Sequence, residues 1–97
     1  MVLKFNISGD SLGTRFLGKT LRIKIENSIK EGENVVFDFS GVKNISHSFA
    51  DECFGKLLLS WELPDLRSKT TFTNTNEFVK KTIAFTLSER ISKPELV

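Results

Sequence analysis

One short segment of the chain combines the residue types that carry acid–base and nucleophilic chemistry. Residues 46–52, SHSFADE, contain two hydroxyls, the only histidine of the protein and two carboxylates. A histidine next to a serine is the pairing of a general base with a nucleophile. One histidine serves only one role, however, and neither serine stands in the Gly-x-Ser-x-Gly turn of hydrolases. The segment therefore favours a binding surface over a hydrolytic centre, with His47 as a loop residue.

A second candidate for chemistry is Gly13 to Thr20, GTRFLGKT, which satisfies the phosphate-loop pattern G-x-x-x-x-G-K-[ST] letter for letter. Asp38 at the end of VVFD would then resemble the metal-holding end of a strand. A phosphate loop needs small residues, because its backbone N–H groups must turn tightly around the phosphate. Here the bulky residues of RFL fill the middle, and Leu17 begins an apolar series typical of a helix. We therefore interpret this segment as helix.

The metal-ligating residue types are too few and too scattered to form a recognisable metal site. The chain has a single histidine and a single cysteine, and its carboxylates lack the spacing of a metal motif. We expect neither a metal nor another cofactor. Cys53 is followed by Phe54 and Leu57 on one apolar helical face, which predicts a buried thiol, and one cysteine excludes a disulfide framework.

Composition and charge exclude several classes of protein. The 97 residues suit one domain spanning residues 1–97. The formal charge is only +2 and basic residues alternate with acids, so we expect no nucleic-acid partner. The start of the chain lacks the basic and apolar regions of a secretion signal, and no apolar run approaches the length of a membrane span. These features predict a cytoplasmic protein that does not enter a membrane.

Apolar periodicity divides the chain into alternating strands and helices. Residues 2–7 alternate as a half-buried strand, residues 35–39 form a central strand, and residues 70–73 form a weak polar strand. Helices are indicated by apolar residues at four-residue steps over about residues 14–30 and 49–61, with Pro64 after the second. Asn74 and Glu77 resemble a capping pair for a last helix with the inner stripe Val79, Ile83, Leu87 and Ile91.

This order of elements predicts a small α/β domain. Its sheet should have three to four strands, parallel by default, with about three helices packed mainly on one face. The central strand places Val35, Phe37 and Phe39 on one side and the less apolar pair Val36 and Asp38 on the other. We therefore expect the opposite face, or an edge of the sheet, to be available for association, including formation of a homodimer.

Two roles are open for Ser48. It is a natural N-cap for a helix that begins at Phe49, with Asp51 near the positive end of the helix dipole. A phosphate on Ser46 or Ser48 would face free helix N–H groups, which favours it, whereas Asp51 and Glu52 would oppose it. Ser48 is therefore both a predicted cap and a candidate phosphorylation site.

The run VVFDFSGVKNISHSFADECFGKL resembles a STAS-like family of unknown function, whose members carry a strand ending in an acid, a G-V pair and a helix opening F-A-D-E. The residues that carry the resemblance are Asp38, Gly41, Val42, Phe49, Ala50, Asp51 and Glu52. The resemblance implies a domain similar to anti-sigma-factor antagonists, which bind histidine-kinase-like ATPases and are turned off by phosphorylation of a serine. Ser48 corresponds to that serine by position, although Phe49 stands where a glycine follows it in the antagonists.

These observations predict a non-enzymatic regulatory module that binds a protein in signal transduction. The expected contact surface, including exposed acids at the start of a helix, comprises Ser46, His47, Ser48, Phe49, Asp51 and Glu52. The resemblance implies a histidine-kinase-like ATPase as the partner. Two alternatives stay open: a nucleotide-binding protein that uses residues 13–20 and Asp38, and an immunity or antitoxin protein that blocks a toxin.

Overall fold

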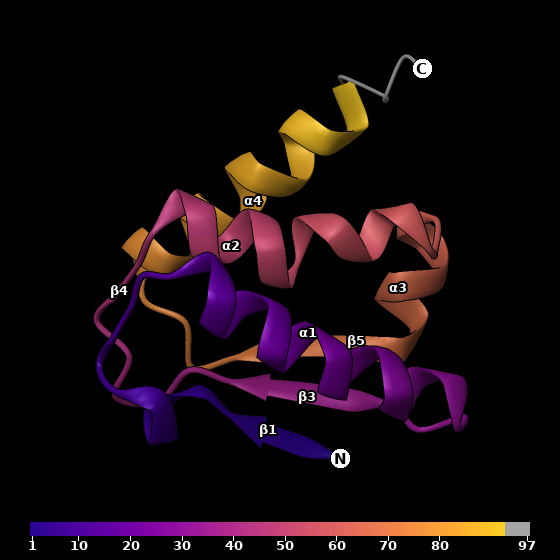
Figure 1. Cartoon of the computed structure of the whole chain (residues 1–97), viewed down its shortest axis with the longest axis horizontal. Coiled ribbons are helices and arrows are strands. Elements are labelled where there is room, and N and C mark those ends of the chain that lie inside the picture. The colour runs from indigo at the N-terminus through magenta and orange to yellow at the C-terminus, as the bar shows by residue number, and fades with distance from the viewer. Residues whose placement is uncertain (93–97) are drawn as a thin grey trace.

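The computed structural model describes residues 1–92, which form strands and helices in alternation (Figure 1). The strands are β1 (Val2–Lys4), β2 (Ser11–Leu12), β3 (Val35–Asp38), β4 (Asn44–Ile45) and β5 (Thr70–Thr73). The α-helices are α1 (Arg15–Lys30), α2 (His47–Cys53), α3 (Leu63–Lys69) and α4 (Glu77–Ser92), and two 3-10 helices are η1 (Phe5–Ser8) and η2 (Gly55–Leu59). The predicted small α/β architecture is confirmed, with one helix more than expected.

The main sheet has three parallel strands in the order β1-β3-β5, and β2 and β4 form a separate parallel pair. Burial alternates along the strands: Leu3, Val35 and Phe37 are buried, whereas Val2 is 59% exposed. The helices lie on the side of the sheet that these buried residues face (Figure 1). The opposite face is not covered by any described helix, which agrees with the sequence prediction.

Phenylalanine rings form a cluster within the largely aliphatic core. Phe54 is 1% exposed and has aromatic contacts with five other rings, those of Phe5, Phe37, Phe39, Phe49 and Phe72. Phe5 stacks on Phe39 with a centroid distance of 4.5 Å. Phe5 opens η1, so the first strand ends at Lys4 and not at residue 7 as the alternation predicts. Phe5 is fully buried in this cluster.

Helix α1 shows why the phosphate-loop pattern does not make a phosphate loop here. The Thr14 hydroxyl accepts a hydrogen bond from the Leu17 N–H at 3.1 Å, so Thr14 caps the helix and residues 15–20 form its first turns. Gly18 packs against α2, where a Cβ would come within 2.9 Å of the Phe49 carbonyl oxygen. This glycine therefore permits a close helix contact. The interpretation of the segment as helix is confirmed.

The middle of the chain differs from the predicted single helix over residues 49–61. The chain forms α2, then η2, and then a separate helix α3. Pro64 lies in the first turn of α3, where its missing N–H costs nothing, so it starts a helix instead of ending one. This was the helix that the sequence prediction missed.

The last helix is capped by a different residue from the one predicted. The Asn76 side chain accepts a hydrogen bond from the Val79 N–H at 2.7 Å, so Asn76 is the cap, while Asn74 adopts a positive φ of 59° and donates to Asp38. Val79 and Ile83 are buried as predicted, but Ile91 is 52% exposed. Ile91 lies on the same side of α4 as Leu87, where both line a groove with residues of α3, but it is only partly covered.

Candidate functional site

The start of α2 is fixed by Ser46. Its Oγ accepts a hydrogen bond from the Phe49 N–H and donates one to the Gly13 carbonyl oxygen, both at 2.9 Å. The Ser46 N–H also donates to the Leu12 carbonyl, which extends the pairing of β2 with β4. The helix therefore begins at His47, and the prediction of Ser48 as its cap was wrong. Ser48 is the second residue of the helix and is half-buried.

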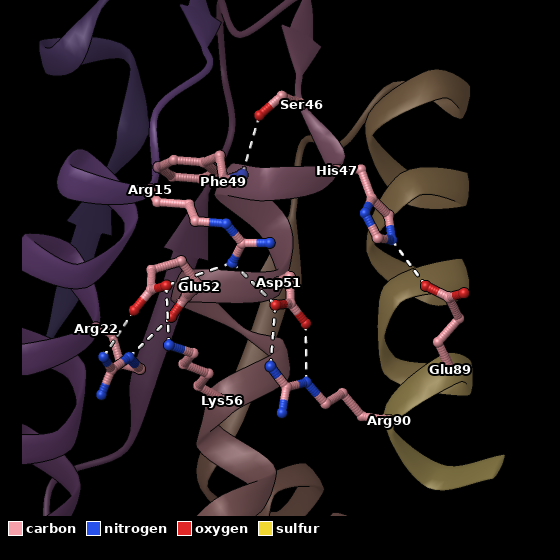
Figure 2. Close-up of polar contacts among 10 residues, drawn as sticks. All are labelled: Arg15, Arg22, Ser46, His47, Phe49, Asp51, Glu52, Lys56, Glu89 and Arg90. Atoms are coloured by element: carbon pink, nitrogen blue, oxygen red, sulfur yellow. Dashed lines mark hydrogen bonds and ion pairs between the residues drawn. The ribbon is translucent and has the colours of Figure 1, made fainter. Parts of the chain in front are cut away.

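The two acids of α2 face other helices and not solvent (Figure 2). Asp51 is held by Arg90 of α4, whose Nε and Nη2 donate at 2.8 and 2.9 Å, and by Arg15 of α1 at 3.0 Å. The Asp51 side chain is only 15% exposed. The expectation of exposed acids at the start of this helix was wrong, and Asp51 instead joins α2 to both neighbouring helices.

Glu52 is still more enclosed, with a side chain 8% exposed. Arg22 donates from Nη2 to its carboxylate at 3.0 Å and from Nε to its backbone oxygen at 2.8 Å. Lys56 and Arg15 contribute further ion pairs at 3.1 and 3.4 Å. Phe49, the third residue of this group that the sequence predicts to touch a partner, is fully buried. The side chains of Phe49, Asp51 and Glu52 therefore pack inside the protein. A direct contact of these residues with a partner stays a prediction.

Both acids are charged at neutral pH. The hydrogen bonds from Arg90, followed by those from Arg15, lower the pKa of Asp51 from its ordinary 3.8 to about 2, although burial opposes this. Burial raises the pKa of Glu52, but the hydrogen bonds from Lys56 and Arg22 outweigh it and the pKa is lowered overall. Carboxylates held ionised in this way are poor proton acceptors. Their arrangement suits a structural role.

The lowered pKa of Asp51 predicts a loss of stability in acid. Asp51 contributes fully above its ordinary pKa of 3.8, and this contribution is lost as the pH falls from about 4 to about 2. The free energy of unfolding should fall by about 2 kcal/mol over this window on account of Asp51 alone. Urea denaturation at a series of pH values measures it. An Asp51→Asn variant that keeps the full acid dependence of the parent would contradict this assignment.

His47 lies one helical turn before Asp51 on the side of α2 that faces α4, and it is exposed (Figure 2). Its Nε2 lies 2.9 Å from the Glu89 carboxylate, and its ring lies 5.6 Å from the ring of Phe85. A shallow hollow of about 270 Å³ is lined here by His47, Asp51, Glu89 and Arg90. The exposed His47 therefore lies next to Glu89 and Arg90 of α4, which the sequence did not predict as part of the site.

Phe78 and Phe85 are separated by two helical turns and lie on one side of α4, where they are 54% and 58% exposed. The sequence contained a signal for them, because both fall outside the inner stripe that Val79 and Ile83 define. We call His47, Ser48, Phe78, Phe85 and Glu89 the α2–α4 surface. Of the six predicted contact residues, only His47 and Ser48 belong to it.

Asp38 has a local structural role. The hydrogen bonds from the Asn74 side chain at 3.0 Å and from the Ser40 N–H at 2.9 Å lower the pKa of Asp38 and close the turn after β3.

Burial raises the pKa of the Cys53 thiol, whose predicted burial is confirmed. Over residues 1–92, no three His, Cys, Asp or Glu side chains gather where they could hold a metal ion. No helix within these residues is long and apolar enough to cross a membrane.

Comparison with known proteins agrees with this architecture. A family model described as a STAS-like domain of unknown function (DUF4325) matches residues 18–80. No curated protein and no solved structure matches the chain. The matched segment runs from within α1 through α2 to the first turn of α4, so it includes the acids that join these helices. Because it covers more than half of the 97 residues, the chain belongs to this family of STAS-like domains.

Proposed function

We propose that this domain is a non-enzymatic regulatory module that binds a protein partner through the α2–α4 surface. The observation that carries the proposal is the exposure of Phe78 and Phe85 on one side of α4, beside the exposed His47. Aromatic side chains are enriched in protein interfaces, where they bury a large area at a low entropy cost. Two such rings next to a polar helix start suit a protein partner.

The polar contacts beneath the surface support this function. The paired hydrogen bonds between Arg90 and Asp51 fix α4 against α2, and the contact of His47 with Glu89 adds a second link between the same helices. A surface held rigid before binding loses less entropy when the partner arrives. The carboxylates therefore serve binding indirectly, through the relative position of the two helices.

The same contacts favour binding over turnover. The Ser46 hydroxyl is engaged in the helix cap, and the carboxylates of Asp51 and Glu52 are paired with basic side chains. His47 and Glu89 form a pair, but no described hydroxyl or thiol is hydrogen-bonded to His47. A nucleophile next to a base, as covalent catalysis needs, is therefore missing from the described residues.

The family resemblance to anti-sigma-factor antagonists suggests a histidine-kinase-like ATPase as the partner, in the cytoplasm. Ser48 lies within the α2–α4 surface, and a phosphate there would add a charge of about −1.5 to −2. We propose that this charge reduces the affinity for the partner, since the aromatic rings of the same surface favour a partner with apolar groups.

The proposal predicts that Phe85→Asp weakens binding at least tenfold, about 1.4 kcal/mol, because it places a charge in the interface. The proteins encoded by the genes that flank the gene of this chain are tested for co-purification with it. Calorimetry then measures the affinity of the parent chain and of the variant for the protein that co-purifies. Leu59→Asp is the matched control, since Leu59 is 60% exposed and lies outside the α2–α4 surface. Equal affinities for the parent and a folded Phe85→Asp variant would contradict the proposal.

A further inference from the structure

The open edge of β5 has the features of a strand-binding site. Among the described strands β5 pairs only with β3, so its other edge has no partner strand. The Phe39 N–H donates to the Thr73 carbonyl oxygen at 3.0 Å, which shows that the backbone groups of Thr73 face β3. Successive residues of a strand direct these groups to alternate sides. The N–H and C=O of Phe72 therefore point toward the open edge.

An apolar groove lies along this same edge. Its volume is about 450 Å³, within the range of roughly 300–1,000 Å³ of ligand sites. The lining comes from β3, η2 with the preceding Phe54, α3, β5 and α4, and its other main apolar residues are Leu57, Leu66, Phe72, Leu87 and Ile91. Phe72 and Ile91 are 37% and 52% exposed here. An apolar groove next to unpaired backbone groups suits an occupant that offers both side chains and a backbone.

The charge of the groove indicates the chemistry of the occupant. Arg67 is the one charged residue in the lining, and none of the ion pairs within residues 1–92 includes it. A carboxylate is the natural partner of a guanidinium group. A small apolar acid would satisfy Arg67 but would leave the Phe72 backbone groups unpaired. A peptide strand that contains an acidic residue satisfies both.

We propose that an extended segment of a partner protein adds to β5 as a fourth strand of the sheet. Alternate side chains of this strand enter the groove, because successive residues of a strand point to opposite faces. The segment is apolar at these positions and carries an Asp or Glu that reaches Arg67. This site lies on a different side of α4 from Phe78 and Phe85, so the inference goes beyond the proposed function and does not depend on it.

Selection from a displayed library of random octapeptides tests this inference. The folded chain should enrich peptides with alternating apolar residues and an acid, and Ala84→Trp should abolish their binding, since Ala84 lines the groove and is exposed. Lys81→Trp is the matched control on the same helix, outside the groove, and should retain binding. Failure to enrich peptides, or peptides that bind Ala84→Trp as they bind the parent, would overturn the inference.

Two further measurements separate a strand from other occupants. Binding of a selected peptide should slow hydrogen exchange of the Phe72 amide at least tenfold, and N-methylation of alternate peptide nitrogens should abolish binding.

Arg67→Glu should weaken binding at least tenfold, and a peptide with Lys in place of its acid should restore it. Binding of decanoate but of no peptide would indicate a small-molecule site, and dimerisation that Ala84→Trp prevents would indicate a second copy. Either result would overturn the inference.

Discussion

Replacement of Phe54 by alanine is expected to lower the free energy of unfolding by about 3–5 kcal/mol. Phe54 is 1% exposed, and the centroids of the five neighbouring rings lie 5.3 to 6.3 Å from its own. Alanine removes all of these contacts and leaves a cavity that the rigid rings around it cannot fill. Urea denaturation followed by circular dichroism measures the loss.

Phe85→Ala is the matched control for this substitution. It deletes the same atoms, but Phe85 is 58% exposed, so the free energy of unfolding should change by no more than about 0.5 kcal/mol. A loss at Phe54 as small as that at Phe85 would contradict the description of the core. Together the two variants also separate a ring that stabilises the fold from a ring of the proposed binding surface.

The second large effect is expected for Arg22→Leu, at about 3 kcal/mol. This change leaves the carboxylate of Glu52, 8% exposed, without its bond of 3.0 Å from Arg22, and the Glu52 carbonyl oxygen without its bond of 2.8 Å. An unpaired acceptor in a buried position loses its hydration without compensation. The remaining ion pairs of Glu52 with Lys56 and Arg15 limit the loss.

Adding Glu52→Leu to this variant should recover part of the stability, because it removes a buried carboxylate that has lost its bond from Arg22. If Arg22→Leu alone cost no more than about 1 kcal/mol, this would argue against a stabilising ion pair between Arg22 and Glu52. Lys43→Ala is the control for loss of an exposed ion pair, since Lys43 and Asp10 are 77% and 60% exposed and lie 3.7 Å apart. It should cost less than about 1 kcal/mol.

The elements that local sequence determines were predictable. Thr14 followed by Leu17, Leu21, Ile25 and Ile29 predicts α1 with its first turn, and this pattern correctly overrides the phosphate-loop match of the same residues. The central strand β3 and its apolar face follow from VVFDF in the same way. Leu21, Ile25 and Ile29 of α1 and Val35 and Phe37 of β3 are buried, and Leu17 is partly buried.

The features that long-range contacts determine were not predictable. Ser46 and Ser48 are both good caps, and the choice depends on the pairing of β2 with β4, which brings Gly13 to Ser46. The acids of α2 are enclosed by arginines that lie 30 to 39 positions away in the chain, with no local signal for the contact.

The enclosure of these acids changes how the binding surface must be tested. Charge reversal at Asp51 or Glu52 would place like charges next to Arg90, Arg15 or Arg22, so a loss of binding would report on folding. Substitutions at exposed residues such as Phe85 avoid this problem.

Cross-saturation NMR with the partner bound tests the proposed binding through the α2–α4 surface, since it maps the amides that the partner approaches. The partner is the flanking-gene product that binds the chain. Signal loss should be concentrated at residues of the α2–α4 surface, at His47 and Ser48 and at Phe78 and Phe85. Signal loss confined to the uncovered face of the sheet, at Val2 and Lys4 of β1, would contradict it.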